Sequence, residues 1–240
     1  NHMLENVAAA LTARHKSEQR IRSFVADASH ELRTPLASIR GYAELTRRSD
    51  SELPDEARNS LARIESESVR MTTLVEDLLL LARLDAGRPL EFSPVDLSAL
   101  VVDCTNDAHV AGPDHRWELR LPSEPVVVTG DSDRIHQVIA NLLANARVHT
   151  PPASTVTITL QQREQDAVIG VHDNGPGIPP ALLPEIFGRF SRGDSSRSRE
   201  AGSTGLGLAI VSAVVAAHHG TISVDSRPGD TAFTLTLPLA

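Results

Sequence analysis

The sequence predicts a multi-domain chain in which an α-helical hairpin is followed by an α/β sandwich. Two apolar stripes at helical spacing, one over residues 21–43 and one over residues 61–81, predict the hairpin. Beyond them, segments of alternating polarity interleave with helical segments, which is typical of an α/β fold. We place the domain boundary after residue 86, where Gly87 and Pro89 interrupt both patterns.

Composition restricts the class of protein. The chain has 240 residues, of which 40% are hydrophobic and 22% are charged, as in an ordinary soluble globular protein with room for two domains. Its net charge of −8 is opposite in sign to a surface that binds phosphate backbones, so we expect no nucleic-acid partner. The only cysteine, Cys104, cannot form an internal disulfide, and we interpret it as a small buried residue without chemistry.

The first half of the chain is predicted to be helical from its beginning. Residues 1–3 are interpreted as an expression scar, and Leu4, Val7 and Leu11 then lie at helical spacing. No stretch reaches the ~20 apolar residues of a membrane-spanning helix. Pro54 separates the two long stripes into a hairpin. Two helices of this length cannot bury their own apolar faces, so we expect a homodimer that forms a four-helix bundle.

The second half is predicted to fold as strands and helices around one sheet. The segment after the boundary alternates in a strand-like manner. Short turns join 155–161 to 167–173 and 221–225 to 231–237, so both pairs are expected to be antiparallel, with helices covering one face. We expect strands at 117–121, 126–129, 155–161, 167–173, 221–225 and 231–237, and helices at 131–149 and 205–219.

A reactive histidine is predicted on the first long helix, within the sequence HELRTPL at residues 30–36. His30 is rotated by about 200° from the apolar stripe, so its imidazole is expected in solvent, where another domain can reach it. The neighbouring carboxylate of Glu31 can accept its proton. Thr34 lies one turn further along the same face, where its hydroxyl can orient a water molecule.

Two asparagines at helical spacing form a candidate metal site. Asn141 and Asn145 lie at i and i+4 on the polar face of the helix predicted at 131–149. An amide oxygen suits a Mg²⁺ ion that keeps several waters and takes its other ligands from phosphates, so Asn145 is the predicted metal ligand. In isolation, such asparagines are equally typical of an ordinary helix surface.

A turn that suits a flat ligand follows the strand predicted at 167–173. Asp173 can accept a hydrogen bond from an amino group, and Gly175 and Gly177 let the backbone come close to the ligand. Taken alone, this sequence is also typical of a plain turn.

The remaining pieces of the site flank a polar segment. Arg189 lies between two phenylalanines in EIFGRF, residues 185–190, and the segment 191–203 that follows is rich in Ser, Arg and Gly. Gly205 and Gly207 then open a helix, where backbone N–H groups and the helix dipole can bind phosphate oxygens.

Together these motifs resemble those of the sensor histidine kinases of bacterial two-component systems, from about residue 17 to the end of the chain. Residues 24–45 resemble the phosphoacceptor box. The four later pieces, in this order, resemble the Bergerat-type ATP fold that these kinases share with Hsp90-like chaperones, type II topoisomerases and MutL-like repair proteins. The cofactor-binding residues that the resemblance implies are Asn141, Asn145, Asp173, Gly175, Gly177, Arg189, Gly205 and Gly207.

The resemblance also implies an activity. ATP and Mg²⁺ are the implied cofactors, and His30 accepts the γ-phosphoryl group with Glu31 as its base. Thr34 serves dephosphorylation of the response regulator, and Asp173 gives specificity for adenine. The partners are a second copy of the chain and the receiver domain of a cognate response regulator, whose aspartate then takes the phosphoryl group.

Three segments follow from the resemblance. Residues 1–16 are the remnant of a membrane-proximal signalling helix, residues 17–86 are the dimerisation and histidine phosphotransfer domain, and residues 87–240 are the catalytic ATP-binding domain. The chain is expected to be the cytoplasmic portion of a membrane-anchored sensor, and to meet the membrane only through segments that it does not contain.

One position departs from the family pattern. Where many members have a lysine that reaches the phosphates, this chain has Val148, while Arg147 points about 100° away on the helix and His149 is a further candidate. Two alternatives therefore remain open: a protein that mainly dephosphorylates its regulator, or a degenerate ATP-binding dimeric scaffold. The intact pair of His30 and Glu31 argues against the scaffold.

Overall fold

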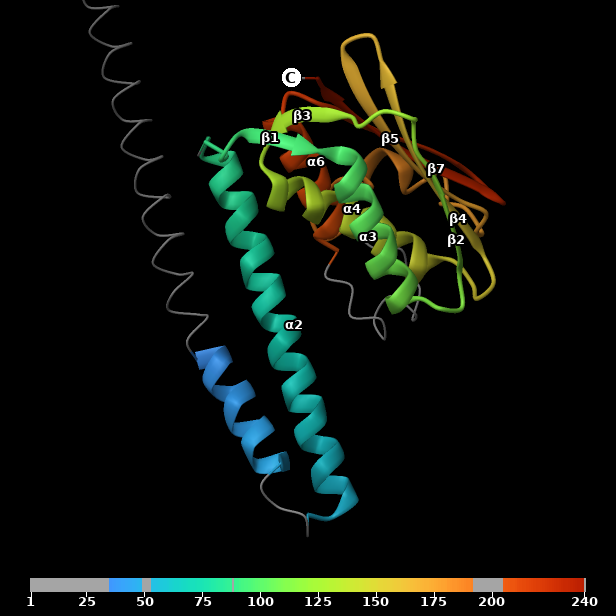
Figure 1. Ribbon diagram of the computed structural model, residues 1–240. Helices are drawn as coiled ribbons and strands as arrows, with labels where there is room; N and C mark the ends of the chain where they lie inside the picture. Colours follow the sequence, from blue (N-terminus) through green and yellow to red (C-terminus); the bar gives the residue numbers. More distant parts are fainter. Residues whose placement is uncertain (1–34, 49–52, 88, 192–204, 240) are drawn as a thin grey trace, which may run out of the picture. The chain divides into compact units, whose positions relative to one another are not determined.

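The structure, a computed structural model, describes residues 35–48, 53–87, 89–191 and 205–239. The chain divides into two compact units, Asn1–Arg88 and Pro89–Ala240 (Figure 1). The predicted domain boundary after residue 86 lies close to this division. Among the described residues, no helix combines the length and the apolar character that crossing a bilayer requires.

The first unit contains a helical hairpin. Residues 35–48 form one helix, and α2 (Asp55–Asp85) forms the other. Pro54 directly precedes α2. The acidic residues Asp55 and Glu56 in the first turn of α2 interact favourably with the positive end of the helix dipole. The guanidinium of Arg47 donates to the Glu65 carboxylate at 3.1 Å, which joins the two helices near their connection. The hairpin predicted from the two apolar stripes is therefore confirmed.

Helices and a mixed sheet make up the second unit. The central sheet has five strands in the order β2-β4-β5-β7-β6, and β1 and β3 pair separately as an antiparallel ribbon. Within the central sheet β2 runs parallel to β4, and the remaining pairs are antiparallel, as expected for the two pairs predicted from short turns. The strands are β1 (Ser93–Asp96), β2 (Arg116–Arg120), β3 (Val127–Gly130), β4 (Thr155–Arg163), β5 (Asp166–Asp173), β6 (Thr221–Arg227) and β7 (Asp230–Pro238).

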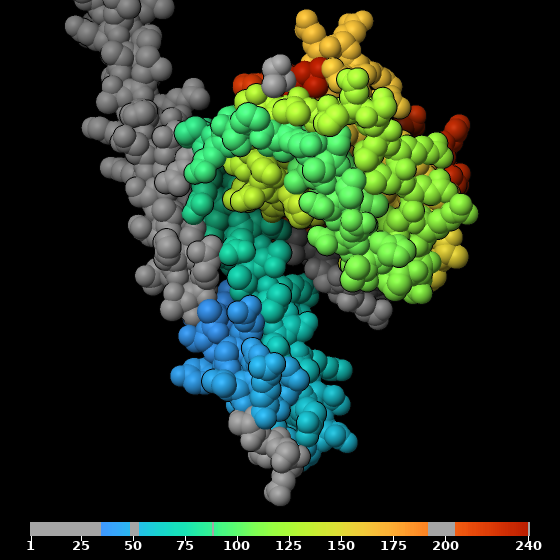
Figure 2. All heavy atoms as spheres, viewed as in Figure 1, coloured from blue at the N-terminus to red at the C-terminus, as the bar shows by residue number. Residues whose placement is uncertain are grey.

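Three helices cover one face of the central sheet: α3 (Leu97–Ala111), α4 (Ser132–His149) and α6 (Gly207–Ala217) (Figure 1). Strand β7 shows the pattern expected of a sheet with one covered face: its residues alternate between buried and half-buried along the strand. Its buried set includes Phe233 and Leu235, which face the helices. In the space-filling view, β1, α3 and the following connection (green) form much of one side of this unit (Figure 2).

The segment after the domain boundary differs from the prediction. Strand-like alternation was expected there, but only the short β1 is extended, and the helix α3 follows at once. The reason is a local cap: the Asp96 carboxylate accepts hydrogen bonds from the backbone N–H groups of Ser98 at 2.8 Å and Ala99 at 3.1 Å. The buried side chains of α3, Leu97 and Val101 among them, then recur at helical spacing.

Candidate functional site

The predicted site residues fall into two groups along the sequence. His30, Glu31 and Thr34 lie outside the described residues. The others all belong to the second unit, where they occupy α4, the turn after β5, the segment before residue 191 and the start of α6. The geometry below concerns this second group.

One face of α4 connects the two ends of the site. Asn141, Asn145 and His149 recur at intervals of four residues, so they follow one face of the helix over about 12 Å. At one end, the Asn141 amide donates a long hydrogen bond of 3.5 Å to the carbonyl of Gly207, the first residue of α6. At the other end, His149 interacts electrostatically with Asp173. Asn145 lies between them, half-buried.

Asp173 is the last residue of β5, and only 6% of its surface is exposed. Its Oδ1 accepts a hydrogen bond from the backbone N–H of Gly175 at 2.9 Å. Burial raises the pKa of Asp173 above the ordinary aspartate value, while the Gly175 N–H and the nearby His172 and His149 oppose the shift. Burial in turn lowers the pKa of His149. A buried carboxylate with one oxygen already oriented is suited to accept a hydrogen bond from a ligand.

Both glycines of the turn after β5 lie where a side chain would not fit. A Cβ at Gly175 would lie 2.5 Å from the methyl carbon of Thr150 and 2.7 Å from Oδ1 of Asp173. Gly177 has φ +81°, and a Cβ there would lie 2.7 Å from the backbone of Arg227. The backbone at both glycines is therefore packed closely against Thr150, which follows α4, and against the β6–β7 turn.

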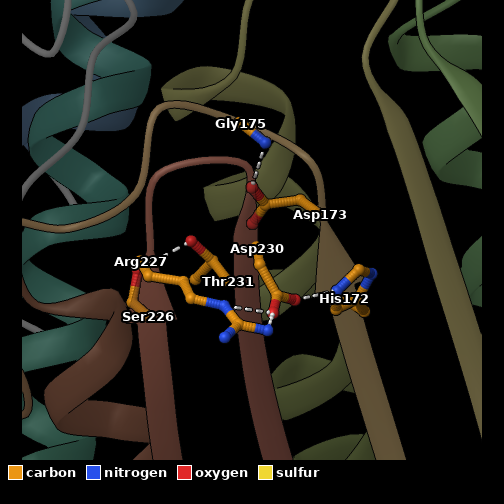
Figure 3. A network of polar contacts seen from close by, with 7 residues as sticks. All are labelled: His172, Asp173, Gly175, Ser226, Arg227, Asp230 and Thr231. Carbon is orange, nitrogen blue, oxygen red and sulfur yellow. Dashed lines mark hydrogen bonds and ion pairs between the residues drawn. The ribbon is translucent and has the colours of Figure 1, made fainter.

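A polar network supports the end of β5 from the neighbouring strands (Figure 3). Thr231 lies directly opposite Asp173 in the β5–β7 register, and its hydroxyl is 2.8 Å from that of Ser226 on β6. Ser226 in turn accepts a hydrogen bond from the backbone N–H of Ile178 at 2.9 Å. No sequence motif marks Ser226 or Thr231, because only the strand register shows that they lie beside Asp173.

On the neighbouring strand position, His172 hydrogen-bonds to Asp230, which also accepts from Arg227 at 2.6 and 2.8 Å (Figure 3). These contacts tie β5 to the turn between β6 and β7, whose Gly229 N–H donates to the carbonyl of Gly175 at 2.8 Å. The turn that carries Gly175 is therefore held from the sheet side as well.

A backbone hydrogen bond joins Phe190 to Gly205, which lie on either side of residues 191–204. The backbone N–H of Phe190 donates to the carbonyl of Gly205 at 2.9 Å, and both residues have positive φ. Phe187 packs edge-on against the buried Phe233, with ring centroids 6.4 Å apart, which anchors this part of the chain to the sheet. Arg189 is exposed. Gly205 lies two residues before the start of α6, whose first turn no described side chain caps.

Arg147 is directed away from the stripe formed by Asn141, Asn145 and His149. Its aliphatic stem packs at the end of α3, where a Cβ on Gly112 would lie 2.8 Å from its Cδ. The contact explains why Arg147 does not bend round the helix to replace the missing lysine.

A metal site in this unit would depend on amide and ligand oxygens. Among the residues that the structure describes, no three His, Cys, Asp or Glu side chains gather closely enough to hold an ion. Asn145 offers one neutral oxygen one turn of α4 beyond Asn141, which suits a Mg²⁺ ion that takes most of its ligands from water and phosphates.

Two family models match the chain. The His Kinase A (phospho-acceptor) domain matches residues 20–87. The histidine kinase-, DNA gyrase B- and HSP90-like ATPase matches residues 130–240.

Named relatives cover both units. The probable sensor histidine kinase TcrY of Mycobacterium tuberculosis is 64% identical over 239 residues, which make up 100% of this chain and 50% of TcrY. The sensor histidine kinase TrcS of the same organism is 52% identical over 244 residues, covering 100% of this chain and 48% of TrcS. The chain thus spans about half the length of these relatives.

Solved structures are also similar to this chain. Full-length ShkA in complex with AMPPNP has a TM-score of 0.76 and 29% identity, and the match covers 91% of this chain and 46% of ShkA. The mycobacterial sensor histidine kinase MprB has a TM-score of 0.55 and 32% identity, and covers 62% of this chain and 97% of its own.

Proposed function

The chain belongs to the sensor histidine kinase family, and on that premise we propose that it phosphorylates its own His30 from ATP and passes the phosphoryl group to an aspartate of a response regulator. The observation that carries the proposal is the buried Asp173, which the N–H of Gly175 orients at one end of the α4 face. The Asn141 contact with Gly207 marks the other end of that face. A nucleotide lying along α4 would thus meet an adenine acceptor at one end and a helix N-terminus at the other.

Each end of this face has a separate role in binding. Asp173 accepts a hydrogen bond from the adenine amino group, and Gly175 and Gly177 let the base lie against the backbone. Gly205 and Gly207 present the N–H groups at the start of α6 to the phosphates. Arg189 adds positive charge close to the Phe190–Gly205 contact. Asn141 positions the first turn of α6, and Asn145 holds the Mg²⁺ ion, which supplies positive charge to the phosphate oxygens when it is bound.

The transfer step requires chiefly positioning. His30 attacks the γ-phosphorus in line with the leaving oxygen, and Glu31 takes the imidazole proton as the new bond forms. Thr34 orients water for the reverse task of dephosphorylating the response regulator. The three residues lie on the segment matched by the phospho-acceptor family model.

The proposal includes a homodimer. Among the described residues of the hairpin, six large apolar side chains are exposed in the single chain, and Tyr42 is 74% exposed. Together they would be covered by a second hairpin in a four-helix bundle. They are Ile39, Tyr42, Leu45, Ile64, Val69 and Met71.

We further propose that the protein acts in the cytoplasm as part of a membrane-anchored sensor. Its named relatives are sensor kinases about twice as long as this chain. Residues 1–16 are then the membrane-proximal end, residues 17–86 the dimerisation and phosphotransfer domain, and residues 87–240 the ATP-binding domain.

Incubation with γ-labelled ATP and Mg²⁺ tests the activity. Wild type is expected to acquire a label that is lost in acid and stable in alkali, as phosphohistidine is. His30→Gln should acquire none, whereas His109→Gln, a matched change at an exposed histidine of α3, should label like wild type. A wild-type protein that binds ATP without labelling would contradict the autokinase proposal and favour the phosphatase or scaffold alternatives.

A further inference from the structure

His115, which was not among the predicted site residues, contacts a residue that packs against the turn after β5. Nε2 of His115 lies 2.9 Å from Oγ1 of Thr150. The Thr150 hydroxyl donates its own hydrogen to the carbonyl of Ala146 at 2.8 Å, so Nε2 of His115 is the donor in the first contact. Thr150 is buried, with 8% of its surface exposed, and these two bonds fix the rotamer of its side chain.

This contact is the polar anchor of the His115 ring. Its other nitrogen, Nδ1, is buried and has no hydrogen-bond partner among the described residues. The ring lies beside Trp117, with centroids 6.0 Å apart, and the Trp117 indole N–H donates to the carbonyl of Gly112 at 2.9 Å. The aromatic neighbour therefore holds the ring in place, while Nε2 makes the directional bond.

The backbone around His115 is fastened to the same region. The N–H of Ala153 donates to the carbonyl of Asp114 at 2.7 Å, and the N–H of Arg116 donates to the carbonyl of Ser154 at 2.9 Å. The N–H of Thr155 in turn donates to the side chain of Asn174 at 2.8 Å. Hydrogen bonds thus connect three segments in a row, which we call the strap: the start of β2, the turn before β4, and Asn174, the residue before Gly175.

Thr150 connects His115 to the candidate nucleotide site, because it contacts both His115 and Gly175. Its methyl group occupies the space beside Gly175, since a Cβ there would lie only 2.5 Å away from it. The N–H of Gly175 is the group that orients the Asp173 carboxylate. A change in the Thr150 rotamer would therefore move the wall that carries this N–H.

We propose that His115 is a positioning residue of the nucleotide site, which acts through Thr150 and Gly175 to hold Asp173 in the orientation that accepts the adenine base. The inference rests on the proposed ATP-binding function. His115 itself does not touch the nucleotide.

Calorimetric titration with ATP tests the inference in four variants of the full chain: His115→Ala, His115→Gln, Thr150→Val and the double variant H115A/T150V. His115→Ala is expected to raise the Kd for ATP about 5-fold, the equivalent of one ordinary hydrogen bond. His115→Gln keeps an N–H at a similar distance and should stay within about 2-fold of wild type. The double variant should be no weaker than the weaker single variant, because both changes break the same bond.

His109→Ala is the matched control, since this histidine is exposed on α3. Trp117 is the only tryptophan of the chain, so its emission shows whether each variant keeps the local packing. If His115 had only a structural role, His115→Ala would lower the free energy of unfolding, and His115→Gln would not restore the affinity for ATP.

The outcomes separate the two proposals. A wild-type protein that does not bind ATP overturns the proposed function itself. Wild-type binding with an unchanged Kd in His115→Ala overturns only the positioning role. Equal losses in His115→Ala and His115→Gln, or additive losses in the double variant, also overturn it.

Discussion

Oδ1 of Asp173 accepts a hydrogen bond from the backbone N–H of Gly175 at 2.9 Å, where β5 ends and the turn begins. Replacing this carboxylate by an amide in Asp173→Asn removes a charged acceptor, so we expect the Kd for ATP to rise about 10- to 100-fold. Because burial raises the pKa of Asp173, wild-type affinity should also fall on acidification at a pH above the ordinary value of 3.8. Titration of both proteins from pH 8 down towards pH 3.8 measures this, and a wild-type Kd no more pH-dependent than that of Asp173→Asn would contradict it.

Gly175→Ala introduces a Cβ within 2.5 Å of Thr150 and 2.7 Å of Asp173. We expect a loss of about 1–3 kcal/mol in the free energy of unfolding, as for other overpacked sites, together with weaker ATP binding. Gly41→Ala is the control, because a Cβ at this helical position meets nothing within 4 Å. Urea unfolding compares the two variants, and equal stabilities would show that the turn after β5 can relax.

Asn145→Ala tests the predicted metal ligand. In wild type, removal of Mg²⁺ with EDTA should weaken ATP binding, whereas the variant should bind ATP equally with and without the ion. A loss of about 10-fold in the presence of Mg²⁺ corresponds to about 1.4 kcal/mol. Asn106→Ala, on the exposed surface of α3, should keep the full Mg²⁺ dependence. If Asn145→Ala retains that dependence, Asn145 is not the ligand.

Asp230 is held by His172 and by Arg227, and these contacts lower its pKa below the ordinary aspartate value, the His172 hydrogen bond contributing most. A lowered carboxylate pKa contributes stability that is fully present above the ordinary value of 3.8 and is lost as the pH falls through the lower folded value. Asp230→Asn should therefore be less stable than wild type at pH 7, and the difference should shrink below pH 3.8. Urea unfolding with Asp225→Asn as the control measures it; a constant difference at all pH values would count against the ion pairs.

Asp77 of α2 shows the opposite shift, since burial and the charge of Glu76 raise its pKa to about 6. An ionised Asp77 therefore costs stability above pH 6, and the cost is relieved as the pH falls from 6 towards 3.8. Asp77→Asn should stabilise the protein at pH 8 by about 3 kcal/mol at most, and the gain should vanish below pH 3.8. Unfolding of equal concentrations at both pH values tests this, with Glu76→Gln expected to give a smaller gain.

Local patterns in the sequence were sufficient for most elements. The apolar stripes predicted the hairpin, and alternation predicted five strands of the central sheet and the antiparallel pairing of two strand pairs. The glycines after β5 were selected because their spacing suits close backbone approach, and the structure shows that a Cβ would not fit at either position. The helix α3 was missed, since its cap depends on the orientation of one side chain, Asp96.

The sequence by itself thus predicted most of the elements and selected the candidate site residues, because periodicity and turn residues are properties of neighbouring positions. The tertiary structure alone decided which distant residues meet. It placed Thr231 opposite Asp173, directed Arg147 onto Gly112, and joined His115 to Thr150 across 35 positions. These contacts follow from strand register and helix packing, which minimise exposed apolar surface over the whole unit and leave no trace in any short stretch of sequence.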